Sequence, residues 1–207
     1  WGMAAPAFVA FALACLSFVS ALLFLPESLP KERRQITPAL SFSSRFRALS
    51  DVHELPRLFG LMFVYVTAFA IMETSFVLFA ERRLSFGVRE TGHVFTYIGV
   101  LMVIVQGVLI GRLAQRFGER RLLLLGLGAV SVGLCGVAQA HGLMPLLVTV
   151  ALVAIGSGLI NPSVQALVSK SSPTDRQGLA LGFLQSIGAL GRVAGPPETG
   201  ERGALSK

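Results

Sequence analysis

Long apolar segments alternate with short charged segments along this 207-residue chain. Five segments are almost free of charge: residues 1–25, 58–80, 91–111, 122–169 and 177–191. Together they contain one charged residue, Glu73. A surface helix of a soluble protein turns one polar face to water, so the 48 consecutive uncharged residues 122–169 argue against a soluble fold. The pattern predicts an all-α, polytopic membrane helical bundle.

The lengths of these segments predict six transmembrane spans. A helix rises about 1.5 Å per residue, so about 20 residues cross a hydrocarbon core about 30 Å thick. As one helix, segment 122–169 would be about 72 Å long, so it must hold two spans. His141, Gly142 and Pro145 supply the break between them. The predicted spans are 6–25, 58–80, 92–114, 122–140, 146–169 and 178–197.

The basic residues predict the orientation of these spans. The net charge is +7, but Lys and Arg flank the apolar segments instead of forming one basic face, which argues against a nucleic-acid partner. The connections 26–57, 112–121 and 170–176 hold 12 of the 18 basic residues, and the opposite side holds 6. Because Lys and Arg are concentrated in cytoplasmic loops, these three connections are predicted to be cytoplasmic.

The long connection 26–57 carries an amphipathic pattern. Phe42, Phe46 and Leu49 recur at helical spacing beside Arg45 and Arg47. This pattern predicts a helix that lies on the inner membrane surface. A linker without regular structure is the alternative interpretation.

The sequence offers little support for an enzyme. Cys15 and Cys135 lie inside apolar segments, and neither has a partner at disulfide or metal-ligand spacing. No nucleophile–base pair is visible either. We therefore expect no catalytic residue, no metal and no organic cofactor.

The turn between the third and fourth predicted spans carries a distinctive motif. Residues 111–121 form GRLAQRFGERR, which resembles the G-x-L-a-D-R-x-G-R-[RK] loop of the major facilitator superfamily. Residues 25–30 look like the exit of that family's sixth helix. Residues 185–196 resemble the eleventh helix of drug:proton antiporters similar to the tetracycline-efflux group, and Asn161-Pro162 and Gln106-Gly107 fit the same group.

The resemblance implies that this chain covers helices six to eleven of twelve. Residues 1–25 would be the last helix of the N-terminal half, 26–57 the central loop and 58–197 five spans of the C-terminal half. Residues 198–207 form a polar tail where the family continues with a twelfth helix, and Gln115 replaces the acidic residue of the loop motif. A truncated chain that is inactive alone is therefore expected.

By the same resemblance, the parent transporter exports amphipathic, tetracycline-like drugs by alternating access and draws its energy from the proton gradient. Its partners would be the lipid bilayer, the drug, protons and the missing N-terminal half, in the bacterial cytoplasmic (inner) membrane. Two alternatives stay open: an uptake carrier for a sugar or an organic acid, and a membrane remnant or interaction protein without transport.

Glu73 is the candidate proton-coupling residue, because coupled transporters commonly use a carboxylate inside the membrane. Desolvation would favour its neutral form and so assist proton uptake. The alternative is that Glu73 reaches the outer interface or pairs with Arg82.

Gln106, Asn161 and Gln185 are candidate substrate-cavity residues, because each places an amide in an apolar segment. Each could instead hydrogen-bond a neighbouring helix. Pro162 removes a backbone donor in mid-span, which predicts a kink.

Small residues four apart predict close helix packing at Gly107/Gly111, Gly178/Gly182 and Gly191/Gly195, with Pro196 next to the last pair. Arg192 between Gly191 and Gly195 could extend to the outer interface or bind a substrate anion.

The loop motif itself is a candidate cytoplasmic gate formed by Gly111, Arg112, Arg116, Gly118, Arg120 and Arg121. In this hypothesis the arginines hold helix ends in one state and release them in the other. The alternative is that they only anchor the topology. The three histidines, His53, His93 and His141, receive no proton-relay role.

Overall fold

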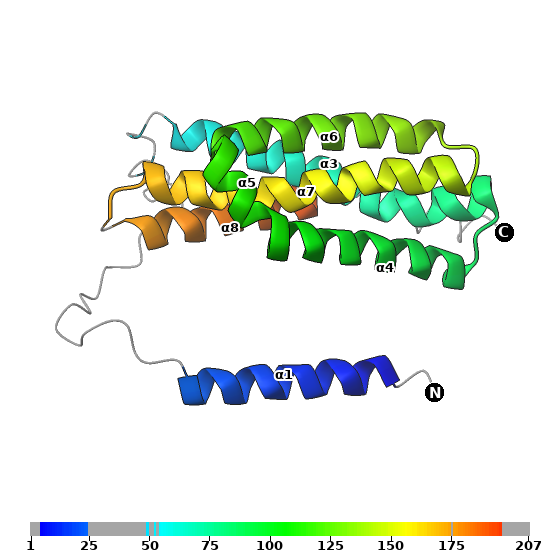
Figure 1. Cartoon of the computed structure of the whole chain (residues 1–207), viewed down its shortest axis with the longest axis horizontal. Helices are drawn as coiled ribbons and strands as arrows, with labels where there is room; N and C mark the ends of the chain where they lie inside the picture. The colour runs from blue at the N-terminus through cyan, green and yellow to red at the C-terminus, as the bar shows by residue number, and fades with distance from the viewer. Residues whose placement is uncertain (1–4, 25–48, 50–51, 53, 175, 196–207) are drawn as a thin grey trace, which may run out of the picture. The chain divides into compact units, whose positions relative to one another are not determined.

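The computed structural model describes residues 5–24, 49, 52, 54–174 and 176–195. The chain divides into two compact units, Trp1–Leu40 and Ser41–Lys207, which are considered separately. Every regular element in the described ranges is a helix (Figure 1). These helices confirm the all-α fold class.

The first unit contributes the helix α1, Ala5–Phe24. Its described side chains, from Phe8 to Phe24, are all exposed, and apolar residues occur on every side. A helix that is apolar all round is suited to lipid or to a protein core. It lies where the first span was predicted, and its described apolar stretch, Phe8–Phe24, is shorter than those of the rods below.

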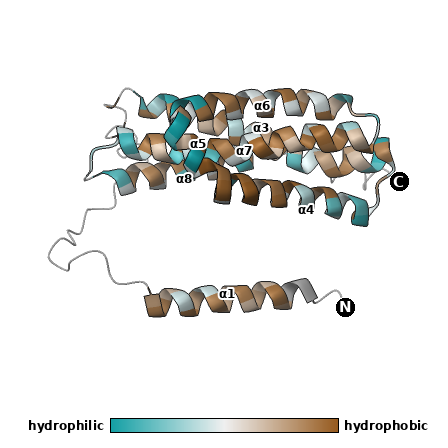
Figure 2. Ribbon diagram, viewed as in Figure 1, coloured by the Kyte–Doolittle hydropathy of each residue, from teal (hydrophilic) through white to brown (hydrophobic). Residues whose placement is uncertain are grey.

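The second unit contains five rods of helix. They are α3 (Leu55–Leu84), the continuous rod α4 (Val88–Ile104), η2 (Val105–Leu109) and α5 (Ile110–Phe117), then α6 (Glu119–Gln139), α7 (Leu143–Ser171) and α8 (Gln177–Ala194). The rods 55–84, 88–117, 119–139 and 143–171 are long and apolar enough to cross a membrane. Figure 2 shows hydrophobic residues along their middles and hydrophilic residues at their ends. Four of the six predicted spans are thereby confirmed.

The helix α8 occurs at the predicted sixth position but is less apolar than a typical span. Its 18 residues, about 27 Å of helix, include Gln177, Gln185 and Arg192. These polar residues lower its hydropathy, and two of them, Gln185 and Arg192, line a cavity described below. Its composition is that of a helix that faces a polar cavity as well as lipid.

Two predicted local features differ in their outcome. The break around residue 141 is confirmed, because α6 ends at Gln139 and α7 begins at Leu143. Pro162 lies inside α7, which continues as one helix, and the predicted kink there stays a prediction. In the neighbouring rod, η2 is a π-helical turn. Such turns are often associated with functional positions in helices.

The predicted surface helix around residues 42–49 is only partly testable, since Phe42, Phe46, Arg45 and Arg47 lie outside the described residues. Leu49 is described, and it is buried in a core cluster with Leu55, Phe59 and Phe183. The prediction that Leu49 faces the membrane surface is therefore wrong for this residue, because the start of α3 covers it.

The packing of α6 against α7 depends on glycine. A Cβ atom added to Gly126 would lie 2.8 Å from the Gly156 carbonyl oxygen, and one added to Gly156 would lie 2.6 Å from the Gly126 carbonyl oxygen. Gly133 and Gly136 extend this contact toward Thr149 and Val153. The two backbones thus touch along most of the hairpin, as small-residue interfaces in membranes permit.

Of the three glycine pairs predicted from their spacing, one packs closely against another helix and two do not. Gly191 and Gly195 lie against α3, with Phe63 and Thr67 carbonyl oxygens 3.2 Å and 3.1 Å from the added Cβ positions. Gly107, Gly111, Gly178 and Gly182 have no atom within 4 Å of such a position. Close helix packing was predicted at these four glycines, but none of them contacts another helix in the described part of the chain.

Contacts at the ends of the helical rods agree with the prediction that successive connections lie at opposite ends of the bundle. Lys170 Nζ lies 2.5 Å from Glu119 Oε1, and the Ser171 hydroxyl donates to Glu54 Oε2 at 3.2 Å, so the starts of α3 and α6 meet the end of α7. At the other end, Arg83 of α3 donates to the Ala138 carbonyl oxygen at 3.2 Å. The described ends of the predicted cytoplasmic connections, at Glu54, Glu119 and Lys170, therefore share one end of the second unit (Figure 1).

This arrangement predicts which turns an impermeant thiol reagent reaches. With Cys15 and Cys135 replaced by serine, a Gln115→Cys variant in intact cells should stay unlabelled, because the arginine-rich turn is predicted to face the cytoplasm. A Gly142→Cys variant at the opposite end should be labelled under the same conditions. Inside-out vesicles should reverse the two results. Labelling of Gln115→Cys in intact cells would contradict the orientation.

Candidate functional site

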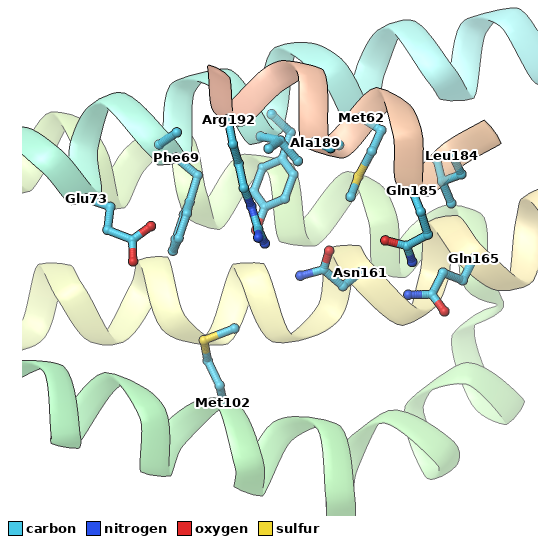
Figure 3. Close-up of a pocket in the computed structure, with 14 residues that line it drawn as sticks. Met62, Phe69, Glu73, Met102, Asn161, Gln165, Leu184, Gln185, Ala189 and Arg192 are labelled. Carbon is cyan, nitrogen blue, oxygen red and sulfur yellow. The ribbon is translucent and has the colours of Figure 1, made fainter. Parts of the chain in front are cut away.

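A cavity of about 340 Å³ lies between α3, α4, α7 and α8 (Figure 3). This volume is at the lower end of the range for small-molecule sites. Fourteen residues line it: Met62, Tyr65, Val66, Phe69, Ala70, Glu73, Met102, Asn161, Gln165, Leu184, Gln185, Gly188, Ala189 and Arg192.

Helical spacing explains how these residues converge. Residues three or four apart share one face of a helix. The lining residues of α3 follow this rule from Met62 to Glu73, and those of α8 follow it from Leu184 to Arg192. On α7, Asn161 and Gln165 are four apart and face the same cavity. Each helix thus presents one mixed polar and apolar face to the cavity.

The cavity brings together three of the four predicted membrane candidates. Glu73, Asn161 and Gln185 all line it, and Arg192 joins them. Figure 3 shows the Arg192 side chain extending from α8 toward Asn161 on α7, with Glu73 farther along α3. Gln106 does not line the cavity; it lies exposed in the π-helical turn η2.

Glu73 and Arg192 face the cavity without ion-pair partners. Among the described residues, no opposite charge lies within 4.0 Å of either side chain. The predicted alternative in which Glu73 pairs with Arg82 does not occur in this structure. Two opposite charges that are not neutralised by neighbours are available to a ligand or to a proton.

A second polar group borders the cavity on its α3–α7 side. Tyr65 is 7% exposed, and its hydroxyl faces Asn161. Asn161 Nδ2 donates to the Ser157 carbonyl oxygen at 3.3 Å. The Ser157 hydroxyl lies near the Tyr65 hydroxyl but outside hydrogen-bond geometry, and it has no partner within the described ranges. Pro162 leaves the Gly158 carbonyl without its usual helical donor, which adds an acceptor beside this group.

Sequence reasoning missed several lining residues. Gln165 could have been found, because it follows Asn161 at the spacing of one helical turn. Tyr65, Phe69, Met62 and Met102 carry no such signal, since aromatic and methionine side chains occur throughout the spans. Only the tertiary arrangement assigns them to the cavity.

The residues of the loop motif lie apart from the cavity. Gly111, Arg112 and Arg116 belong to α5, while Arg120 and Arg121 belong to α6, and all four arginines are exposed. Gly118 joins the two helices with φ of 78°, a left-handed conformation that favours glycine. Arg116 stacks over the Phe117 ring at 5.6 Å. Within the described chain none of the four arginines forms an ion pair, so the gate hypothesis stays a prediction.

The opposite end of the second unit has its own contact. Arg83 approaches His141 Nε2 at 2.7 Å and lies 5.8 Å from the centre of the Phe79 ring. Together with the bond to Ala138, this contact holds the end of α3 against the turn between α6 and α7. Pro196, the last predicted packing residue, lies outside the described residues.

Comparison with known proteins adds an independent line of evidence. Residues 1–196 match the family model described as Major Facilitator Superfamily. Multidrug resistance protein 2 of Bacillus subtilis (strain 168) is 26% identical over 201 residues, which are 95% of this chain and 50% of that protein. Tetracycline resistance protein, class C, of Escherichia coli is 27% identical over 176 residues, which are 84% of this chain and 44% of that protein.

Relatives outside this drug-resistance group also occur. Major facilitator superfamily domain-containing protein 10 of Mus musculus is 28% identical over 196 residues, 84% of this chain and 42% of its own length. The crystal structure of the human organic anion transporter MFSD10 (TETRAN) matches with a TM-score of 0.73 and 26% identity, and the match covers 91% of this chain and 49% of that chain. The chain thus spans about half the length of the relatives it matches.

Proposed function

The chain belongs to the Major Facilitator Superfamily, and from this premise we propose that it forms the C-terminal part of a proton-coupled exporter of amphipathic drugs. Membership in the family makes membrane transport the general activity, in place of an enzyme reaction. The finer proposal includes alternating access, the proton gradient as energy source and the bacterial cytoplasmic membrane.

One observation carries this proposal: the carboxylate of Glu73 faces the cavity and has no cationic partner within 4.0 Å among the described residues. A carboxylate in this position can exchange a proton when a drug enters or leaves, because the two compete for the same charge. The lining between the polar groups is aromatic and aliphatic, which suits an amphipathic molecule. The multidrug and tetracycline resistance proteins among the relatives support the same class of substrate.

A second candidate function rests on Arg192. Its guanidinium group lines the same cavity, and such a group is a strong partner for a carboxylate. An organic-acid carrier, the uptake alternative from the sequence, would use this residue. The organic anion transporter among the similar structures favours keeping it as the second candidate.

Proton release on drug binding distinguishes the two candidates. In weakly buffered lipid nanodiscs at acidic pH, where a glutamate carboxyl is partly protonated, tetracycline binding to the chain should release protons, and Glu73→Gln should abolish the release. Glu81→Gln, at an exposed site that does not line the cavity, is the matched control and should leave it unchanged. Unchanged release from Glu73→Gln would exclude Glu73 as the coupling residue, and binding lost only in Arg192→Gln would favour the organic-acid carrier.

Expression of this chain alone should give no tetracycline resistance in a pump-deficient host. Transporters of this kind bind substrate between two structural repeats, and this chain spans about half the length of its relatives. The measurement is growth across a range of tetracycline concentrations against an empty-vector control. Resistance above the vector level would show that 207 residues suffice for transport.

A further inference from the structure

Glu73 lies at one end of the cavity, and Arg192 lies nearer its middle (Figure 3). Gly191 contacts Phe63 and Val66 of α3, and Gly195 contacts Thr67 and Ala70. These contacts place Arg192 roughly level with residue 66 of α3, about two helical turns before Glu73. The offset along the helix axis is therefore about 10 Å. Figure 3 shows Phe69 between the two labelled side chains.

The space between the charges is uncharged. Phe69 and Met102 contribute aromatic and thioether surface between them, Asn161 lies beside Arg192, and Gln165 and Gln185 lie on the far side of Arg192 (Figure 3). Among the residues that line the cavity, the ionisable ones are Tyr65, Glu73 and Arg192. Neither α4 nor α7 places a charged group on the cavity, so nothing on those helices neutralises either charge.

We propose that this cavity selects dipolar amphipathic molecules, which place an anionic group at Arg192 and a cationic group at Glu73 on either side of an apolar ring system. This inference rests on the proposed function and specifies its substrate class. An ion with one charge pairs with only one of the two charged residues, so it gains one charge-assisted hydrogen bond instead of two. A molecule with both charges, about 10 Å apart, pairs with both residues at once.

The same arrangement gives protons a defined effect. Protonation of Glu73 removes the negative charge of the cavity and leaves the Arg192 charge unchanged. Lower pH therefore weakens the binding of a dipolar molecule, until its affinity equals that of an anion that lacks the cationic group. Proton and substrate cation thus compete at one carboxylate, as exchange transport requires.

Four naphthalene probes of similar size test the proposal with the whole chain in lipid nanodiscs. They are 6-(aminomethyl)-2-naphthoate, which carries both charges, 2-naphthoate, 2-naphthylmethylammonium and neutral 2-naphthylmethanol. At about pH 7.5 the charged groups of all probes are ionised. The dipolar probe is expected to bind about 10-fold more tightly than either singly charged probe, since a charge-assisted hydrogen bond contributes about that much.

Substitutions should divide the probes by charge. Arg192→Gln should weaken the dipolar and anionic probes about 10-fold and leave the cationic probe unchanged, while Glu73→Gln should weaken the dipolar and cationic probes and leave the anionic probe unchanged. Arg192→Lys keeps the charge and should retain most of the discrimination. Arg89→Gln and Glu81→Gln, both exposed and outside the cavity, are the matched controls. A general loss of structure would weaken all four probes together, including the neutral one.

The outcomes separate this inference from the proposed function. Equal binding of the four probes, or a preference for the cation that Arg192→Gln leaves intact, would overturn the dipolar selection and leave the exporter proposal standing. If neither tetracycline nor any probe, the neutral one included, binds a chain that retains its helical circular dichroism, both proposals fail. Dipolar preference in the wild-type chain, lost in both Gln variants, supports the inference.

Discussion

A Gly126→Val variant is expected to lose about 3 kcal/mol of stability in the α6–α7 hairpin, the upper end of the usual cost of overpacking. The first added atom alone would lie 2.8 Å from the Gly156 carbonyl oxygen and 2.9 Å from Ile160 Cγ1. A backbone oxygen cannot rotate away as a side chain can. The two helices must therefore separate, and the glycine contacts along the rest of the hairpin weaken with them.

The stability of the hairpin can be followed by energy transfer between fluorophores. Cys135 of α6 and a cysteine introduced at Val148 of α7 are exposed positions for the labels, with Cys15 replaced by serine. Increasing dodecyl sulfate in mixed micelles should separate the labels, at a lower concentration for Gly126→Val than for the parent chain. Gly128→Val is the matched control, because no atom lies within 4 Å of its added Cβ. Equal losses in both variants would assign the effect to helix propensity instead of packing.

The spans were predictable because the lipid constraint acts on each segment separately. A helix must satisfy its own backbone groups and be about 20 apolar residues long to cross a membrane, wherever its neighbours lie. The uncharged segment 122–169 needed two helices for this reason alone, and the structure places the break between Gln139 and Leu143. The predicted ends were too short, since α3 extends to Leu55 and Leu84 through charged residues that remain helical beyond the apolar segment.

The cavity was predictable only in part. Polar residues in apolar segments are rare and are often functional, which singled out Glu73, Asn161 and Gln185. Their convergence depends on the packing of three helices, with separations of 24 to 112 positions between these residues, which no local pattern encodes. The same limit explains Gln106: its amide lies in the same kind of apolar segment, yet η2 leaves it outside the cavity.

The glycines show the same limit more sharply. Spacing of four residues is equally present at Gly107/Gly111 and at Gly191/Gly195, but only the second pair meets another helix within the described ranges. Conversely, Gly126 and Gly156 belong to different helices and form a close contact, with each added Cβ less than 3 Å from the other glycine's carbonyl oxygen. The spacing of glycines shows where a helix could pack closely against another helix. Which of these positions actually contacts another helix depends on the tertiary fold.

A Gly191→Leu variant should separate α8 from α3 and remove the cavity. Gly191 is buried inside α8, and an added Cβ would lie 3.2 Å from both the Phe63 carbonyl oxygen and Val66 Cβ. The remaining leucine atoms have no space there, so α8 must shift, at a cost of about 2 kcal/mol. Because Glu73 and Arg192 come from these two helices, the shift separates the two charges. Tetracycline binding to the chain in nanodiscs is expected to weaken at least about 10-fold.

The control for this variant lies on the same helix. Gly182 is exposed on α8 and has no atom within 4 Å of an added Cβ, so Gly182→Leu adds the same side chain without a collision. Its tetracycline binding should match that of the parent chain. If Gly191→Leu binds as well as Gly182→Leu does, the contact between α3 and α8 does not determine the cavity. Glu73 and Arg192 would then have to act at separate sites, because only the contact between α3 and α8 keeps these two side chains in one cavity.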